Sequence, residues 1–225
     1  IEDVMGLDFE LVRNSLENRR GPKTASEESL MRNYDFIVSQ IALIKEGDLY
    51  QKFESLSRQV VHRDLTTVNA FLKNDSMRVI DLETLMMAPR ALEFPLMLVG
   101  RGSGKTFEYE EGSFSKLVEG YNSTVNEKLT SEEINVINLL VRHFFLLYLV
   151  VDLVRNPRND AKHLEGIIKS FRRFCEDNPL DTKMPKYIPF QIAYPLEIFD
   201  QNSGVGSVSL KNLPDVERRL KRNIY

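Results

Sequence analysis

The segment VVHRDLTTVNAFL, residues 60–72, interrupts an otherwise helical sequence with a pattern typical of strands around a polar loop. Its apolar ends enclose a polar centre in which Asp64 precedes Asn69 by five positions. A second short run rich in Val and Ile follows KNDS, residues 73–76, whose composition is typical of a tight turn. We therefore predict short strands or extended segments near residues 59–62, 70–72 and 77–80.

A further carboxylate completes this pattern, because Asp81 lies twelve positions after Asn69 in the sequence VIDLE, residues 79–83. Transfer of a phosphoryl group needs a carboxylate near the attacking hydroxyl, which orients that hydroxyl and accepts its proton. It also needs hard oxygen ligands for the Mg²⁺ that bridges the nucleotide phosphates. Asp64, Asn69 and Asp81 provide these groups if a hairpin brings their two loops together. Either Asp alone could instead cap a turn.

The two loops resemble the catalytic and metal-binding loops of the protein-kinase-like fold. HRDLTTVN, residues 62–69, carries that fold's spacing, and IDLE, residues 80–83, is similar to the Ile-Asp-x-Glu of the aminoglycoside phosphotransferase and choline kinase branch. SFSKLVEGY, residues 113–121, is similar to that branch's helix ending in Gly-Tyr. The resemblance covers residues 25–178 and implies the helical C-terminal lobe of such an enzyme.

The resemblance implies a role for each polar residue of the two loops. Asp64 would be the catalytic base that acts on the acceptor hydroxyl. Asn69 and Asp81 would bind Mg²⁺, and Glu83 would be a weaker metal ligand. Arg63 and Asn69 would contact the bound ATP. His62 would hold the catalytic loop in place.

The chain departs from this branch at three points, the first being Thr67-Val68 in place of the usual Pro-Gly or similar pair before the Asn. Where the branch has an Asp shortly after its metal motif, TLMMAPRALEFP, residues 84–95, offers only Glu93. The nucleotide-binding lobe, which precedes the catalytic loop in the family, has no counterpart among the 61 residues before His62, which are predicted to be helical. The sequence begins at Ile1 rather than Met. We therefore expect that the N-terminal lobe has been lost or lies on a longer chain.

The remaining sequence predicts a mainly α fold with a small β-hairpin region, in the α+β class. Capping-box patterns at Thr24–Glu27 and Thr130–Glu133 predict the starts of a helix that ends at Gly47 and of a long buried helix that includes residues 137–154. A last core helix is predicted over residues 159–177. Its inward positions would be Leu164, Ile167, Ile168, Phe171 and Phe174.

A second nucleotide-binding motif is suggested by LVGRGSGKTF, residues 98–107, which ends in Gly-Lys-Thr. A phosphate-binding P-loop needs its first glycine at position 99, but Val99 stands there and the glycine is at position 100. Because the loop is one residue too short to wrap the phosphates with backbone N–H groups, we interpret the segment as a flexible loop rich in Gly and Ser.

The domain organisation predicted from these patterns has two parts. Residues 1–178 would form the kinase-like lobe, with the catalytic loop at 62–69 and the metal loop at 80–83. Residues 179–225 would form an irregular extension packed on that lobe, because prolines interrupt every helical period in its first half. LPDVERRLKRNIY, residues 213–225, is predicted to be a short basic helix with a solvated face or, alternatively, a partner-docking face.

Composition excludes several classes of protein. A net charge of −3 with 28% charged residues does not indicate a nucleic-acid-binding surface. The longest uncharged run in the most apolar segment, residues 144–151, is too short to span a membrane. The single cysteine, Cys175, cannot form an internal disulfide, and we expect a buried, inert thiol in a reducing, cytoplasmic setting. His143 is predicted to be a core histidine with satisfied hydrogen bonds.

The function predicted from the sequence is an ATP- and Mg²⁺-dependent phosphotransferase that acts on a hydroxyl of a small molecule. An acidic pocket would suit a cationic acceptor, and the candidates are Glu93, Glu108, Glu110 and Glu111. A catalytically silent kinase-like module that binds or regulates a partner is the alternative, which the absent lobe favours. A protein kinase is a third alternative, disfavoured because the sequence has no Ala-Pro-Glu segment of that type.

Overall fold

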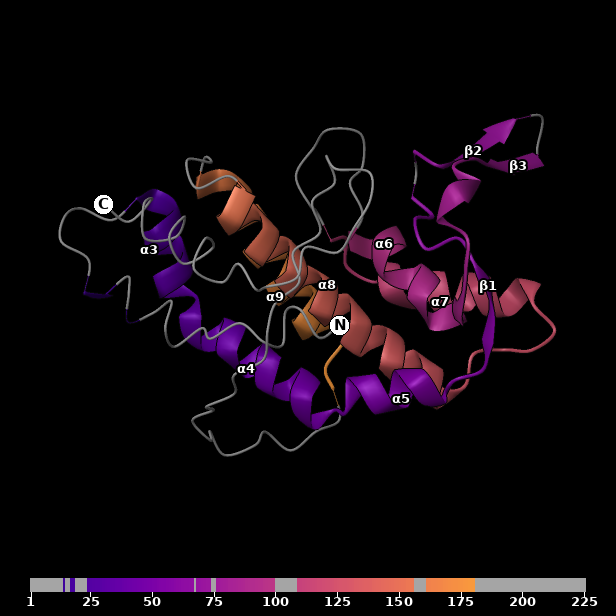
Figure 1. Cartoon of the computed structure of the whole chain (residues 1–225), viewed down its shortest axis with the longest axis horizontal. Coiled ribbons are helices and arrows are strands. Elements are labelled where there is room, and N and C mark those ends of the chain that lie inside the picture. Colours follow the sequence, from indigo (N-terminus) through magenta and orange to yellow (C-terminus); the bar gives the residue numbers. More distant parts are fainter. Residues whose placement is uncertain are drawn as a thin grey trace, which may run out of the picture.

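The computed structural model describes residues 14, 17, 18, 24–66, 68–73, 76–99, 109–155 and 161–180. This part of the chain is mainly helical, as the sequence predicted, and has two small antiparallel sheets, of which only the hairpin was predicted (Figure 1). The α-helices are α3 Ala25–Arg32, α4 Tyr34–Glu46, α5 Leu49–Ser55, α6 Phe94–Val99, α7 Ser113–Thr124, α8 Ser131–Arg155 and α9 Ala161–Asp177. The strands and 3₁₀ helices are β1 Arg58–Val61, β2 Ala70–Lys73, β3 Ser76–Val79, η1 Leu82–Thr84, β4 Met86–Pro89 and η2 Arg90–Glu93.

Helix α8 runs through the middle of the molecule and packs against α4, α5, α6 and α9 (Figure 1). Residues 136–143 are all buried, so other elements cover this helix on every side for more than two turns. Phe145 of α8 stacks on Phe171 of α9 with ring centroids 5.0 Å apart. The predicted inward face of the last helix is confirmed. Its buried residues are Leu164, Ile167, Ile168, Phe171 and Phe174.

The prediction of a single helix from Thr24 to Gly47 is wrong, because the structure has two helices, α3 and α4, in this range. α3 ends and α4 begins at Asn33, whose backbone dihedrals are φ −107° and ψ 7°. The Asn33 amide Nδ2 donates to the Ser29 carbonyl at 2.8 Å, so the side chain competes with the backbone for a helical acceptor. The guanidinium of Arg172 on α9 donates to Asn33 Oδ1 at 3.0 Å, which ties the break to the last helix.

Both predicted capping boxes are confirmed. The Thr24 N–H donates to Glu27 Oε2 at 2.6 Å, while the Glu27 N–H donates to Thr24 Oγ1 at 3.3 Å. The same reciprocal pair joins Thr130 and Glu133 at the start of α8, at 2.8 and 3.1 Å. Each box gives acceptors to N–H groups that the first turn of a helix leaves unpaired.

The predicted hairpin is confirmed, and a fourth strand was missed. β2 pairs with β3 in an antiparallel register that sets Ala70 opposite Val79. β1 pairs with β4, so Val61 lies opposite Met86. The sequence of β4, MMAP, is too short to show alternation, and its partner lies about 28 residues earlier in the chain. Only the tertiary fold brings these two strands together.

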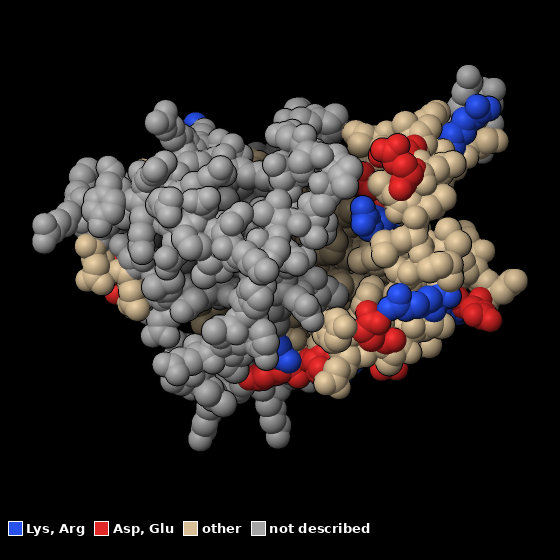
Figure 2. Space-filling model, viewed as in Figure 1, with Lys and Arg blue, Asp and Glu red and all other residues tan. Residues whose placement is uncertain are grey.

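The β end of the molecule is apolar on its surface. Except for Tyr50 and Met97, every large apolar side chain that is exposed in the described residues lies between residues 60 and 87. Figure 2 shows this end of the described surface as broad uncharged areas between a few charged side chains. β2 and β3 contact each other, and neither packs closely on another element of the described structure. Exposed patches of this extent mark interaction surfaces in soluble proteins.

Several predictions lie wholly or partly outside the described residues. The extension of residues 181–225 with its basic helix, Glu108 and most of the glycine-rich loop belong to this group. The segment before that loop is the α-helix α6, whereas a P-loop follows a strand, which supports rejection of the P-loop interpretation. None of the described helices is both long enough and apolar enough to cross a membrane.

Burial shifts the pKa values of two groups in the helical part, Cys175 and His143. The Cys175 thiol is half-buried, whereas a buried thiol was predicted, and desolvation raises its pKa to about 12, which favours the protonated form at neutral pH. His143 is buried, but its Nδ1 has no hydrogen-bond partner among the described residues, so the expected satisfied histidine is wrong at that atom. Burial lowers the pKa of His143 from 6.5 to about 3.

The buried guanidinium of Arg142 links three helices through neutral partners. Its Nε donates to Asn138 Oδ1 at 2.9 Å and its Nη2 to the Asn178 carbonyl at 2.7 Å. Its Nη1 donates to Gln40 Oε1 on α4 and to Cys175 Sγ on α9. None of these partners is a carboxylate, and burial lowers the pKa of Arg142. Hydrogen bonds rather than an ion pair therefore hold this charge in the core.

The close approach of α4 to α8 predicts an asymmetry between two glycines. A Cβ at Gly47 would lie 2.9 Å from Leu139 Cδ1 and 2.9 Å from the Leu43 carbonyl, whereas a Cβ at Gly120 would meet nothing within 4 Å. We expect Gly47→Ala to lower the free energy of unfolding by about 1–3 kcal/mol. The control, Gly120→Ala in α7, should raise it by roughly 0.5–1 kcal/mol. Urea unfolding of both variants tests this, and equal effects would contradict the packing described.

The buried His143 predicts a pH dependence of stability. Because its folded pKa is depressed to about 3, the unfolded chain takes up a proton below pH 6.5 that the folded chain does not. The contribution of His143 to the free energy of unfolding should therefore be constant above pH 6.5. Well below that pH, the free energy of unfolding should fall by about 1.4 kcal/mol per pH unit. His143→Gln should remove this slope between pH 5 and 6.5 in denaturant titrations. Parallel curves for the variant and the wild type would refute it.

Candidate functional site

The candidate site is built on the two loops at the base of the β2–β3 hairpin. The hairpin register continues past Ala70 and Val79, and the Ile80 N–H donates to the Asn69 carbonyl at 2.9 Å. The buried imidazole of His62 joins the same loops, because its Nε2 donates to the Ile80 carbonyl at 2.8 Å. The segment that precedes Asp81 is thus fixed against the loop that contains Asp64. The structural role expected for His62 agrees with this geometry.

Asn69 orders the loop that contains Asp64. Its Nδ2 donates to the Asp64 carbonyl at 2.9 Å and to Asp64 Oδ2 at 3.0 Å. The Asn69 side chain is buried, whereas Asp64 is half-buried and can still be reached from solvent. The backbone is compact here, since the Thr66 N–H donates to the Asp64 carbonyl and the Asn69 N–H donates to the Thr66 carbonyl, both at 3.0 Å.

Each loop contains a residue in the left-handed backbone conformation. Arg63 has φ 68° and Asp81 has φ 65°, and the one other described non-glycine residue with positive φ is Asp48. This conformation costs L-residues energy and is concentrated at functional sites, where surrounding contacts hold it in place. The side chains of Arg63 and Asp81 are both exposed, so they are available to a ligand.

Glu93 holds the strained start of the loop at residues 62–69. Its carboxylate, at the end of η2, accepts the His62 N–H at Oε1 and the Arg63 N–H at Oε2, the latter at 3.2 Å. A carboxylate that accepts two successive N–H groups satisfies donors that the turn would otherwise leave unpaired. Glu93 was predicted as a residue of the acceptor pocket, and the structure gives it this supporting position instead.

The other predicted acidic residues are exposed wherever the structure describes them, and Glu108 lies outside the described residues. Glu83 is exposed on η1. Glu110 lies 3.8 Å from Lys116 on α7, and both side chains are exposed. Glu111 is exposed beside it.

The metal candidates form a small set of oxygen donors. Across the described ranges, no three His, Cys, Asp or Glu side chains gather closely enough to hold a metal ion. Asp64, Asp81 and Glu83 consequently do not form a three-carboxylate cluster. The amide of Asn69 and the carboxylate of Asp81 are nevertheless hard oxygen donors, the type that Mg²⁺ prefers when phosphates and water supply its remaining ligands.

Sequence reasoning missed one polar residue of the site. Thr84 Oγ1 donates to the Asp81 carbonyl at 3.0 Å and lies 3.4 Å from His62 Nδ1. It therefore connects the turn after Asp81 to the buried imidazole. The sequence carries one signal for it, because Thr84 follows IDLE directly, but a lone Thr after a motif does not predict a contact with His62.

The comparisons with known proteins add no assignment. The chain matches no protein-family model, and a search of the curated proteins gave no match. The kinase-like interpretation consequently depends on the motifs at residues 62–69 and 80–83 and on the geometry of the two loops.

The contacts of Asn69 predict its contribution to stability. Asn69→Ala removes two hydrogen bonds from a buried side chain and leaves the Asp64 carbonyl without one of its donors. We expect a loss of about 1–3 kcal/mol in the free energy of unfolding. Asn135→Ala on the exposed face of α8 is the matched control and should change stability by less than about 0.5 kcal/mol. A loss no larger than the control's would show that the Asn69 contacts contribute nothing.

Proposed function

We propose that the chain is the helical lobe of an ATP- and Mg²⁺-dependent phosphotransferase that transfers the γ-phosphate to a hydroxyl of a small molecule. The proposal follows from the resemblance of residues 62–69 and 80–83 to the loops of the aminoglycoside phosphotransferase and choline kinase branch. The observation that supports it best is the double linkage of these loops, in which Ile80 is bound both to Asn69 and to His62, while Asn69 also holds Asp64.

In this proposal each residue has one task. Asp64 accepts the proton of the acceptor hydroxyl and orients its oxygen for attack, for which a half-buried carboxylate held by one amide is suited. Asn69 and Asp81 hold Mg²⁺, with Glu83 as a weaker candidate. When bound, Mg²⁺ neutralises charge on the phosphates. The exposed guanidinium of Arg63 is placed next to Asp64 in the chain and would contact the nucleotide.

The apolar β end supports a second part of the proposal, namely that a nucleotide-binding lobe covers this surface. The exposed apolar side chains between residues 60 and 87 surround the two loops along the chain. Residues 24–57, which precede β1, form only helices and turns, so the described part of the chain supplies no β-rich lobe of its own. We propose that this lobe belongs to the same full-length protein.

A silent binding or regulatory module is the second candidate, and one specific observation favours it. The described residues contain no group of three His, Cys, Asp or Glu side chains that could hold a metal ion. A relative that has lost catalysis could keep Asn69 and His62 because they stabilise the loop. Such a module would use the apolar β end to bind its partner and would not need ATP.

Calorimetric titration with Mg²⁺–ATP tests the proposal. We expect metal-dependent binding by the wild type and at least about tenfold weaker binding by Asp81→Asn, a loss of about 1.4 kcal/mol. Asp35→Asn on the exposed face of α4 makes the same chemical change away from the site and should bind like the wild type.

Two results would count against a phosphotransfer site. Equal binding by Asp81→Asn and the wild type would remove Asp81 from the metal site. If the chain does not bind Mg²⁺–ATP, the titration is repeated with the full-length gene product. If that protein does not bind Mg²⁺–ATP either, the result favours the silent module. An acceptor screen with cationic alcohols follows only if binding is observed.

A further inference from the structure

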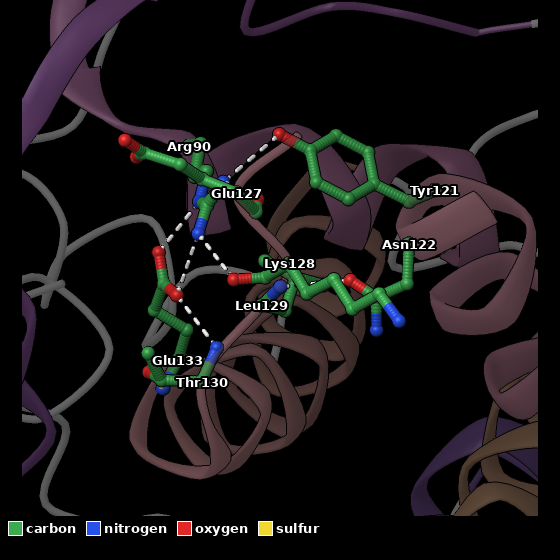
Figure 3. A network of polar contacts seen from close by, with 8 residues as sticks. All are labelled: Arg90, Tyr121, Asn122, Glu127, Lys128, Leu129, Thr130 and Glu133. Carbon is green, nitrogen blue, oxygen red and sulfur yellow. Dashed lines mark hydrogen bonds and ion pairs between the residues drawn. The ribbon is translucent and has the colours of Figure 1, made fainter. Parts of the chain in front are cut away.

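A shielded ion pair joins η2 to the start of α8. Arg90 Nε donates to Glu133 Oε1 at 2.6 Å and Arg90 Nη2 donates to Oε2 at 2.9 Å, so the pair is bidentate (Figure 3). The side chains are only 15% and 8% exposed. The hydrogen bonds from Arg90 lower the pKa of Glu133 and raise that of Arg90, so both groups are charged at neutral pH. Shielded bidentate pairs have a fixed geometry that exposed pairs lack.

Arg90 also binds the connection between α7 and α8. Its Nη1 donates to the Glu127 carbonyl at 2.7 Å, and its Nη2 donates to the Lys128 carbonyl at 3.0 Å. The Tyr121 hydroxyl of α7 lies 3.5 Å from Nη1 (Figure 3). The guanidinium thus has acceptors on Glu133, on the connection between α7 and α8, and on Tyr121. Its position therefore depends on the conformation of this connection.

The other end of η2 reaches the candidate site. Arg90 is the first residue of η2 and Glu93 is the last, one short turn further on. Ala91 between them is fully buried, and η2 packs against both α8 and β1. Glu93 accepts the N–H groups of His62 and Arg63, the residues just before Asp64. A continuous set of contacts therefore runs from Glu133 to the catalytic loop.

We infer that the Arg90–Glu133 ion pair positions the catalytic loop through Glu93, and so makes the geometry at Asp64 depend on the connection between α7 and α8. Arg90 and Glu93 are positioning residues in this inference, since neither needs to touch a substrate. Whatever binds the connection at Glu127 and Lys128 would then alter the loop. This regulation of the site rests on the proposed function, whereas the mechanical linkage does not.

Amide hydrogen exchange, followed by NMR at the N–H groups of His62 and Arg63, tests the linkage without any nucleotide. We expect Glu133→Gln, which keeps the shape but removes the charge, to raise exchange at both amides about tenfold, the change that about 1.4 kcal/mol produces. Glu93→Gln is the positive control for loss of the carboxylate itself. Glu165→Gln breaks the exposed ion pair with Arg32, 2.9 Å long, and should leave both amides unchanged.

Two outcomes would overturn the inference. Glu133→Gln could leave His62 and Arg63 protected while Glu93→Gln exposes them, which would show that Glu93 acts alone. The increase could also extend equally to core amides such as Leu140 and Phe171, which would show general loosening of the fold. Arg90→Lys, which keeps the charge but not the bidentate geometry, provides a milder variant in case Glu133→Gln unfolds.

The catalytic consequence is measured separately in the full-length protein. If it binds Mg²⁺–ATP and transfers phosphate, Glu133→Gln should lower kcat several-fold, because the displaced loop carries Asp64. An unchanged kcat with increased amide exchange would overturn the regulatory part alone. A protein without transferase activity would refute the proposed function and leave the exchange result as the test of the linkage.

Discussion

Burial of α8 is the constraint on which the rest of the structure depends. Eight successive residues, 136–143, are removed from water, and a helix covered on all sides needs neighbours all around it. α4, α5, α6 and α9 supply that cover. The approach of α4 is close enough that Gly47 has no space for a side chain against Leu139. The polar groups that this burial traps, Arg142 and His143, are accommodated by neutral hydrogen bonds in one case and by loss of charge in the other.

The core around α8 also fixes the candidate site, through a series of contacts. The N-terminus of α8 carries Glu133, which fixes Arg90 and through it the short turn that ends in Glu93. Glu93 in turn accepts backbone donors from the loop, where Arg63 adopts a left-handed conformation. A strained loop persists only when its surroundings over-determine it, and here the surroundings are a carboxylate, a buried imidazole and a buried amide. The side chains left exposed include Arg63 and Asp81, two of the residues that the proposed function uses.

The two ends of the molecule differ in how they meet solvent. Among the described residues, the helical end keeps its large apolar side chains inside except for Tyr50 and Met97, whereas the β end exposes them over residues 60–87. Two-stranded sheets are marginally stable in water unless another layer covers them. Either the proposed nucleotide lobe or the partner of a silent module would supply such a covering layer. Titration with Mg²⁺–ATP distinguishes these two proposals.

The sequence by itself determined the features that depend on neighbouring residues. Capping boxes at Thr24 and Thr130, the inward face of α9 and the β2–β3 hairpin are set by spacing within one or two turns, so local patterns predicted them. The break at Asn33, the pairing of β1 with β4 and the position of Glu93 against His62 were decided only by the tertiary structure. In each of these cases the partner lies far along the chain, or the choice between competing hydrogen bonds depends on what packs beside it. For the same reason the motif predicted which residues belong to the site, while the folded core decided how they are held.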